Sequence, residues 1–200
     1  MSEGETTMRT DVHQPIRERW SPTVFTAEEI EPARFIALFE AARWAASSFN
    51  EQPWCFIAGL RGRDDTFEDL VSCLVEGNAV WARHAAALIL TVAKTTYDMT
   101  GEENRHAWHD VGLATGNLCI QAAASGLAVH PMGGFSPERA REKVAIPDGW
   151  EPVTMLAVGV EGDPDRAPEG VTARLRSERT RRPLAEQVFT GRWGATSPLL

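Results

Sequence analysis

The chain alternates between stretches with helical signals and short, strongly apolar runs. Apolar residues that recur every three to four positions are typical of a helix with one buried face, whereas a short continuous apolar run is typical of a buried strand. A short helix can form at residues 13–20, and longer ones are predicted at residues 26–44, 64–78, 102–125 and 136–146. The apolar runs predict strands at residues 54–60, 85–96, 127–135 and 152–160. This order of elements indicates an α+β or α/β domain with about four strands.

Individual residues indicate where these helices begin and end. Thr26 and Glu29 have the spacing of a capping box at the start of the first long helix. Gly77 and Asn78 are residue types that commonly end a helix. The last part of the stretch at residues 102–125 is apolar and small on nearly all sides. This pattern predicts a helix that is buried in the core or at a subunit interface.

Length and charge narrow the class of protein. Two hundred residues suffice for one domain with a sizeable core, and we expect a disordered segment at residues 1–12 followed by a single domain at residues 13–200 with an extended C-terminal tail. The net charge of −8 argues against a general binder of nucleic acid or of anionic membranes. Because the chain has neither an apolar run of about 18 residues nor the apolar core of a signal peptide, we predict a cytoplasmic protein without a membrane span.

Neither the cysteines nor the histidines have the spacing of a metal site. The three cysteines are scattered in apolar surroundings, which is typical of reduced, buried cysteines. His106 and Asp110 share a helical face near His109, but no further cysteine or carboxylate joins them at a suitable spacing. We therefore favour structural or interface roles for these three residues and predict no bound metal.

Six segments of the chain resemble, in the same order, motifs of the nitroreductase family of flavin oxidoreductases, over roughly residues 15–190. They are RERWSPTVF, AASSFNEQPWCFI, GNAVWARHAAALILTVAK, HDVGLATGNLCIQAAASGL, HPMGGF and RTRRPL. The resemblance implies a nitroreductase-like α+β fold, in which helices flank a central, mostly antiparallel sheet of four to five strands and a long central helix lies at a dimer interface. It also implies a homodimer with active sites at that interface, one non-covalent FMN per site, and ping-pong hydride transfer from NADH or NADPH through FMN to an acceptor.

The resemblance assigns residues from both ends of the chain to the FMN phosphate. Arg19 and Ser21, with Trp20 between them, match residues that hold the phosphate and the ribityl chain. A guanidinium suits this role because it binds phosphate through paired hydrogen bonds. Arg179 and Arg181 match a C-terminal basic pair that clamps the phosphate, and the alternative for this pair is a solvated run of charges in the tail.

Two further segments match residues around the flavin rings. The flavin-edge segment of the family is matched by four short polar residues, Ser47, Ser48, Asn50 and Gln52. They suit the polar rim of an isoalloxazine, although a helix end followed by a turn would use the same residue types. The loop that lies against the flavin is matched by Pro131, Met132, Gly133 and Gly134. By the resemblance, a backbone N–H of Gly133 or Gly134 bonds flavin N5, the atom that accepts hydride, and glycine permits this close approach.

Asn78 matches a family position that bonds the pyrimidine end of the flavin. Its alternative is a helix end beside Gly77. His130, at the end of a predicted strand, is interpreted as a structural histidine. No side chain is assigned as a catalytic acid or base, because the hydride chemistry belongs to the cofactor.

Two positions depart from the family pattern. Thr23 and Trp81 stand where many family members carry a cation, the first after the phosphate motif and the second near the N1–C2=O edge of the flavin. A nearby cation stabilises the anionic reduced flavin, so these departures bear on its redox potential. Arg43, Arg83 and Lys94 are candidates to replace the missing charges.

We therefore predict an FMN-dependent oxidoreductase that uses NADH or NADPH and reduces nitroaromatic, quinone or related electron-poor acceptors. An alternative is a protein that binds or modifies flavin without NAD(P)H turnover, and the departures at Thr23 and Trp81 favour it. A further alternative is a non-catalytic dimeric module, in which the tryptophans and the small-residue helix serve only an interface.

Overall fold

The computed structural model describes residues 12–172 and 180–199 of the chain. Its centre is one four-stranded sheet with the strand order β1-β2-β4-β3, in which every neighbouring pair is antiparallel. The strands are β1 (Trp54–Leu60), β2 (Ala87–Lys94), β3 (Ala128–Met132) and β4 (Trp150–Gly159). The predicted α+β class with an antiparallel sheet of four to five strands is confirmed.

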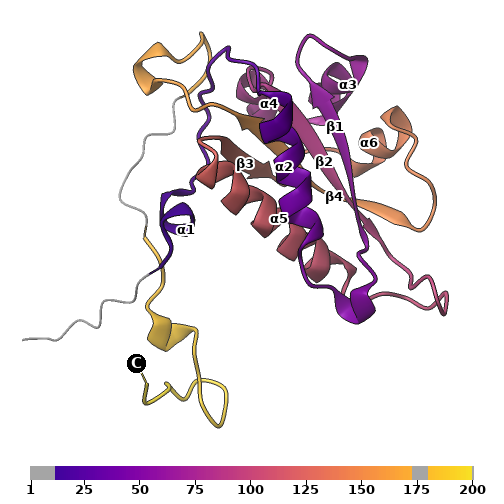
Figure 1. The fold of residues 1–200 in the computed structure, drawn as a ribbon, viewed down its shortest axis with the longest axis vertical. Coiled ribbons are helices and arrows are strands. Elements are labelled where there is room, and N and C mark those ends of the chain that lie inside the picture. The colour runs from indigo at the N-terminus through magenta and orange to yellow at the C-terminus, as the bar shows by residue number, and fades with distance from the viewer. Residues whose placement is uncertain (1–11, 173–179, 200) are drawn as a thin grey trace, which may run out of the picture.

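Helices cover both faces of this sheet (Figure 1). The α-helices are α1 (Gln14–Glu18), α2 (Pro32–Arg43), α3 (Asp65–Cys73), α4 (Glu76–Ala82), α5 (Ala107–Ala124) and α6 (Pro137–Lys143). Three short 3₁₀ segments are η1 (Ser48–Asn50), η2 (Pro164–Arg166) and η3 (Leu184–Glu186). Helices α2 and α5 pack on one face, whereas α3, α4 and α6 contribute to the core on the other. The domain is therefore a three-layer arrangement with two hydrophobic cores.

Strand β2 separates the two cores and contributes to both. Leu88 and Leu90 point into the core shared with α3 and α4, and Ile89 points into the core shared with α2 and α5. All three side chains are fully buried. Because successive residues of a strand face opposite sides, a strand buried on both faces needs a continuous apolar sequence. This requirement explains why the run at residues 85–96 contains so few polar residues.

The first long helix begins later than the sequence suggests. It starts at Pro32, and Glu31 has extended backbone angles, φ −59° and ψ 132°. The ring of a proline disfavours the helical conformation in the residue before it, so Pro32 fixes the first helical position. The predicted capping box is wrong, because the Thr26 hydroxyl accepts a hydrogen bond from the Glu28 N–H at 3.2 Å instead.

The helix predicted at residues 64–78 is two helices. The chain leaves α3 after Cys73, and Leu74 pairs with Phe135 in an isolated antiparallel bridge. Helix α4 then begins at Glu76 and contains both Gly77 and Asn78. These two residues therefore do not end a helix, and the interpretation of Asn78 as a helix end is wrong.

The longest helix starts five residues after its predicted beginning. Residues 102–106 lie outside α5, because Glu103 forms a bridge with Thr96 and the Asn104 N–H donates to the Thr95 carbonyl oxygen at 2.7 Å. At the other end, Gly126 has φ +69°, a left-handed conformation that glycine adopts without strain and that ends the helix.

The described part of the tail extends away from the sheet (Figure 1). Residues 180–199 contain η3 and a bridge between Phe189 and Thr196. The predicted disorder at residues 1–12 falls outside the described residues except for Val12. No helix within the described ranges has the length and apolar character that crossing a membrane requires.

Gly59 in β1 provides a test of how α3 packs on the sheet. A Cβ atom at this position would lie 2.3 Å from the Phe67 backbone nitrogen, so a side chain there must push α3 away from β1. We expect Gly59→Ala to lower the free energy of unfolding by about 2 kcal/mol or more. The control is Gly77→Ala, because a Cβ atom on Gly77 would meet nothing within 4 Å. Urea denaturation of both variants measures the difference, and equal stability would contradict this packing.

Candidate functional site

The segment after α1 carries the first group of predicted site residues. Arg19, Trp20 and Ser21 are all half-buried. The Arg19 Nη1 donates to the Ser21 hydroxyl at 3.2 Å, and the Trp20 indole N–H donates to a Glu161 carboxylate oxygen at 2.9 Å. A cavity of ≈ 280 Å³ opens beside Arg19 and Trp20, with Leu127 among its lining residues. Arg19 and its hydroxyl partner form a donor set that suits phosphate, although the Glu18 and Glu161 carboxylates also line this cavity.

His130 connects this segment to the sheet and to α4. Its Nδ1 lies 2.8 Å from the Pro22 carbonyl oxygen, so this nitrogen carries the proton and donates. Its ring lies 4.5 Å from the Trp81 ring, and Trp81 in turn stacks on Phe25 at 6.3 Å between ring centroids. The interpretation of His130 as a structural histidine is confirmed. Sequence reasoning did not identify it as the link between the arginine segment and α4.

The glycine loop is joined directly to the start of α4. The Gly134 carbonyl oxygen accepts two hydrogen bonds, from the Asn78 side-chain amide at 3.0 Å and from the Val75 backbone N–H at 3.1 Å. A Cβ atom on Gly134 would lie 2.6 Å from the Asn78 amide nitrogen. Gly133, by contrast, is exposed and has open space where a Cβ atom would lie. The loop therefore holds Asn78 with one glycine and leaves the backbone of the other accessible.

The other two predicted residues of this loop face opposite directions. Pro131 is exposed, whereas Met132 is 3% exposed and belongs to the core beneath α3 and α4. Since neighbouring residues of β3 alternate between its faces, only one of them can meet a ligand on the outer side of the loop. The structure favours Pro131 for that position and gives Met132 a packing role.

The polar residues after α2 form a tight turn with an unusual backbone. Phe49, Asn50 and Gln52 all have positive φ angles, of 53°, 57° and 52°. The Ser47 hydroxyl accepts from the Gln52 N–H at 3.0 Å, which closes the turn. Left-handed conformations cost a residue with a side chain of order 1–3 kcal/mol each, so contacts with other elements must hold this turn. Asn50 and Gln52 are exposed, and Ser48 is half-buried.

Within one chain, the polar turn is separate from the other predicted site residues. Helix α2 leads from the end of the sheet near α4 to the opposite end, where the turn lies (Figure 1). The twelve residues of α2 span about 18 Å. Arg19, Ser21, Asn78 and Gly134 therefore form one connected group through Trp81 and His130, and residues 47–52 form another.

The C-terminal arginines remain unplaced with respect to these groups. Arg179 lies outside the described residues. Arg181 is exposed, and its Nη1 donates to the carbonyl oxygen of its neighbour Thr180 at 2.8 Å. The assignment of this pair to a phosphate stays a prediction.

The two departures from the family pattern are integrated into the structure. Trp81 is 6% exposed, and the Thr23 hydroxyl donates to the Thr172 carbonyl oxygen at 3.1 Å. The candidate replacement cations have partners elsewhere. Arg43 pairs with Glu40 at 2.7 Å, Lys94 pairs with Asp98, and the Arg83 Nε donates to the Ala79 carbonyl oxygen at 3.1 Å.

The three cysteines are free and have no activated thiol. Burial raises the pKa of the Cys119 thiol to about 11 and also raises the pKa values of Cys55 and Cys73. Because the thiolate is the reactive form, raised pKa values keep these thiols protonated near neutral pH. Cys73 and Cys119 are buried as expected, whereas Cys55 is exposed, so the prediction of a buried side chain is wrong for Cys55. Among the residues that the structure describes, no group of three or more His, Cys, Asp or Glu side chains is placed to hold a metal ion.

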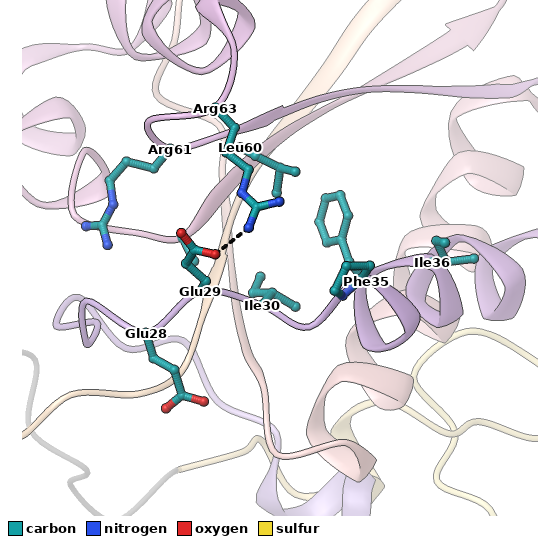
Figure 2. A pocket seen from close by; sticks show the side chains of 10 residues that line it. Glu28, Glu29, Ile30, Phe35, Ile36, Leu60, Arg61 and Arg63 are labelled. Carbon is teal, nitrogen blue, oxygen red and sulfur yellow. Dashed lines mark hydrogen bonds and ion pairs between the residues drawn. The ribbon is translucent and has the colours of Figure 1, made fainter.

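A further cavity, of ≈ 110 Å³, lies between the start of α2 and the end of β1 (Figure 2). An ion pair between Arg63 and Glu29 borders it. Arg61 donates to the His84 carbonyl oxygen at 2.7 Å. None of the predicted site residues lines this cavity. Its charged groups hold the loop after β1 against the segment before α2, which is a structural role.

The junction between the glycine loop and α4 can be tested by substitution. We expect Gly134→Ala to destabilise the protein by about 1–3 kcal/mol, because its Cβ atom would displace the Asn78 side chain. Gly133→Ala is the matched control in the same loop and should leave the free energy of unfolding nearly unchanged. Thermal denaturation of the two variants without added ligand makes the comparison. Similar melting temperatures for both would disprove the assigned difference between the two glycines.

Comparisons with known proteins agree with this architecture. The model of the nitroreductase family matches residues 16–160. A protein of Mycolicibacterium smegmatis, described as an uncharacterized 15.4 kDa protein in the ask 5′ region, is 39% identical over 149 residues, which are 70% of this chain and 97% of that protein.

Solved structures share the fold. The crystal structure of an oxidoreductase containing FMN is 28% identical, with a TM-score of 0.83 over 98% of this chain and 100% of that one. A nitroreductase family protein of Clostridium difficile 630 is 24% identical, with a TM-score of 0.70 over 89% and 96% of the two chains. B. megaterium NfrA2 is 20% identical, with a TM-score of 0.68 over 90% and 73%. The family match covers most of the chain and includes the whole antiparallel sheet, so this protein belongs to the nitroreductase family.

Proposed function

We propose that this protein is an FMN-dependent oxidoreductase that uses NADH or NADPH. The observation that supports this most directly is the connected group of Arg19, Ser21, Asn78 and the glycine loop. It offers a donor set for a phosphate at one end and an accessible backbone at the other. The similarity to an oxidoreductase containing FMN supports the same cofactor here.

The residues of this group fit the parts of FMN. Arg19 lines a cavity and lies within hydrogen-bond distance of the Ser21 hydroxyl, so the two side chains could bind its phosphate through charge-assisted hydrogen bonds. The exposed Gly133 leaves room for a flat ring system to approach its backbone N–H, which a residue with a Cβ atom would hinder. The Asn78 side-chain nitrogen donates to the Gly134 carbonyl oxygen, so the amide oxygen of Asn78 could accept a hydrogen bond from a ligand.

The chemistry that bound FMN supplies is ping-pong hydride transfer from NADH or NADPH to a nitroaromatic, quinone or related electron-poor acceptor. The protein's own residues bind and orient the cofactor and shield it from solvent. Arg19 and Ser21 would hold the phosphate of FMN, and the backbone N–H of Gly133 or Gly134 would donate to the ring atom that receives hydride.

We also propose that the active unit is a homodimer in which α5 forms the interface. One side of this helix presents apolar and small residues to the surface, among them Trp108, Gly112, Leu113, Gly116 and Ile120. A Cβ atom on either glycine would meet nothing within 4 Å, so another helix can approach closely there. A second copy would also bring the polar turn of one subunit toward the arginine and glycine group of the other.

The flavin-binding alternative has one observation in its favour. Trp81 is buried between Phe25 and His130, and it brings no positive charge to the position where a family cation would stabilise reduced flavin. A protein of this kind binds FMN tightly but does not oxidise NADH or NADPH. Turnover measurements separate it from the proposed oxidoreductase.

The proposed function is tested by a visible absorption spectrum with added FMN. We expect the protein to bind one FMN per chain and to shift the visible absorption bands of the flavin. Addition of NADH or NADPH in the absence of oxygen should then abolish this absorbance. Subsequent addition of a quinone should restore the oxidised spectrum. Failure to bind FMN would reject the proposal, and binding without bleaching would favour the flavin-binding alternative.

Arg19 is the side chain whose loss should weaken FMN binding most. We expect Arg19→Ala to reduce FMN affinity by roughly 1.5–3 kcal/mol, the usual range for a hydrogen bond to a charged group. Riboflavin, which lacks the phosphate, should bind the variant and the original protein equally. The control is Arg166→Ala, because Arg166 lies on the surface and pairs with Asp163 at 3.7 Å. Isothermal titration gives both affinities, and an equal loss for riboflavin would contradict a phosphate contact.

A further inference from the structure

The polar turn at residues 47–52 depends on contacts from outside itself. Three of its residues hold left-handed backbone angles, and the bonds within the turn do not offset that cost alone. Glu51 supplies one external contact, because its Oε1 accepts from the Asp98 N–H at 2.5 Å, and two more meet at Ser48. The Ser48 backbone N–H donates to the Asp110 Oδ2 at 3.0 Å, and the Ser48 hydroxyl lies 3.2 Å from the Tyr97 hydroxyl. The neighbouring Phe49 ring packs edge-on against Tyr97 at 5.9 Å.

Asp110 is unusual because it is a carboxylate in the core. Its side chain is 3% exposed, and both of its oxygens have partners. Oδ2 accepts from Ser48, and Oδ1 lies 3.1 Å from the Nδ1 of His109. The first turn of α5, where Asp110 lies, presents the positive end of the helix dipole to it. Burying a charged group without partners costs free energy, and the hydrogen bonds of Asp110 offset this cost.

The position of Asp110 joins the turn to the helix of the proposed dimer interface. Helix α5 is packed firmly on the sheet through Val111, Ala114 and Leu118, all 1% exposed or less. The hydrogen bond to Asp110 therefore fixes the position and orientation of the Ser48 backbone relative to α5. Asn50 and Gln52 follow two and four residues later, so the position of the Ser48 backbone also determines where their exposed side chains lie.

We propose that Asp110 is a positioning residue for the cofactor site, which holds the polar turn in the conformation that meets the flavin edge, with Tyr97 as its second support. This inference rests on the proposed function. Asp110 does not touch the cofactor; it acts through the Ser48 N–H. These contacts would preorganise the turn, so that the cofactor would not have to order it on binding.

The experiment compares three substitutions in the full-length protein. Asp110→Leu keeps a side chain of similar size but removes both acceptors. Asp110→Asn keeps one carbonyl oxygen for the Ser48 N–H and loses the charge. Tyr97→Phe removes only the hydroxyl group near Ser48. The matched control is Asp148→Asn, since Asp148 is exposed in the loop before β4. For each, FMN titration gives Kd, and the bound flavin gives a visible spectrum.

We expect Asp110→Leu to raise the Kd for FMN about tenfold or more and to alter the spectrum of the bound flavin. Asp110→Asn should raise it about threefold, because a neutral hydrogen bond is about half as strong as a charge-assisted one. Tyr97→Phe should change Kd in the same direction without lowering the melting temperature of the protein before FMN is added. The control should leave both Kd and spectrum unchanged.

A purely structural role would lower the melting temperature and leave the Kd and spectrum of the folded fraction unchanged, and that result would overturn the inference. If Asp110→Leu does not fold, an unchanged Kd and spectrum in both Asp110→Asn and Tyr97→Phe would overturn it equally. Failure of the original protein to bind FMN is a different outcome, because it rejects the proposed function itself. Sedimentation of each variant shows whether its assembly state has changed.

Discussion

The carbonyl oxygen of Gly134 is the contact on which the arrangement of the candidate site depends. It accepts hydrogen bonds from the Val75 backbone and the Asn78 side chain, and it thereby joins the end of β3 to the start of α4. With α4 held there, Trp81 lies against the His130 ring, and His130 donates to Pro22. That hydrogen bond in turn positions the segment before Pro22, which contains Arg19 and Ser21. The Gly134 oxygen thus joins residues that lie 56 and 59 positions apart in the chain, and the bond from His130 to Pro22 joins residues 108 positions apart.

Much of the fold could be predicted from apolar patterning, because burial on both faces imposes it. The run at β2 is almost entirely apolar since Leu88 and Ile89 enter different cores, as is typical of a strand that is buried on both faces. The break between α3 and α4 could not be predicted in the same way. The helical pattern continues through Leu74, and only its pairing with Phe135, sixty-one residues later, takes it out of the helix. The sequence around Leu74 carries no information about a contact with a residue so distant in the chain.

In the candidate site, too, some features could be predicted from the local sequence and others depend on contacts between distant parts of the chain. The residue types of the polar turn and of the glycine loop could be matched from the sequence. Arg19 and Ser21 are hydrogen-bonded to each other, and their assignment to a phosphate stays a prediction. The left-handed backbone of Phe49 could not be foreseen, because a bulky side chain disfavours that conformation, whereas asparagine adopts it more readily. It is maintained by Asp110 and Tyr97, which lie fifty to sixty residues away in the chain. Family resemblance identified the participants, and the tertiary contacts explain their geometry.

Pro131 also limits how two copies of this chain can associate. It lies in β3, which is an edge strand of the sheet, and it has no N–H to donate to an added strand. Continuous sheet formation across that edge is therefore interrupted in the middle of a strand of only five residues. The same proline that precedes the glycine loop thus disfavours the addition of a further strand at β3, which protects this edge of the sheet against edge-to-edge aggregation.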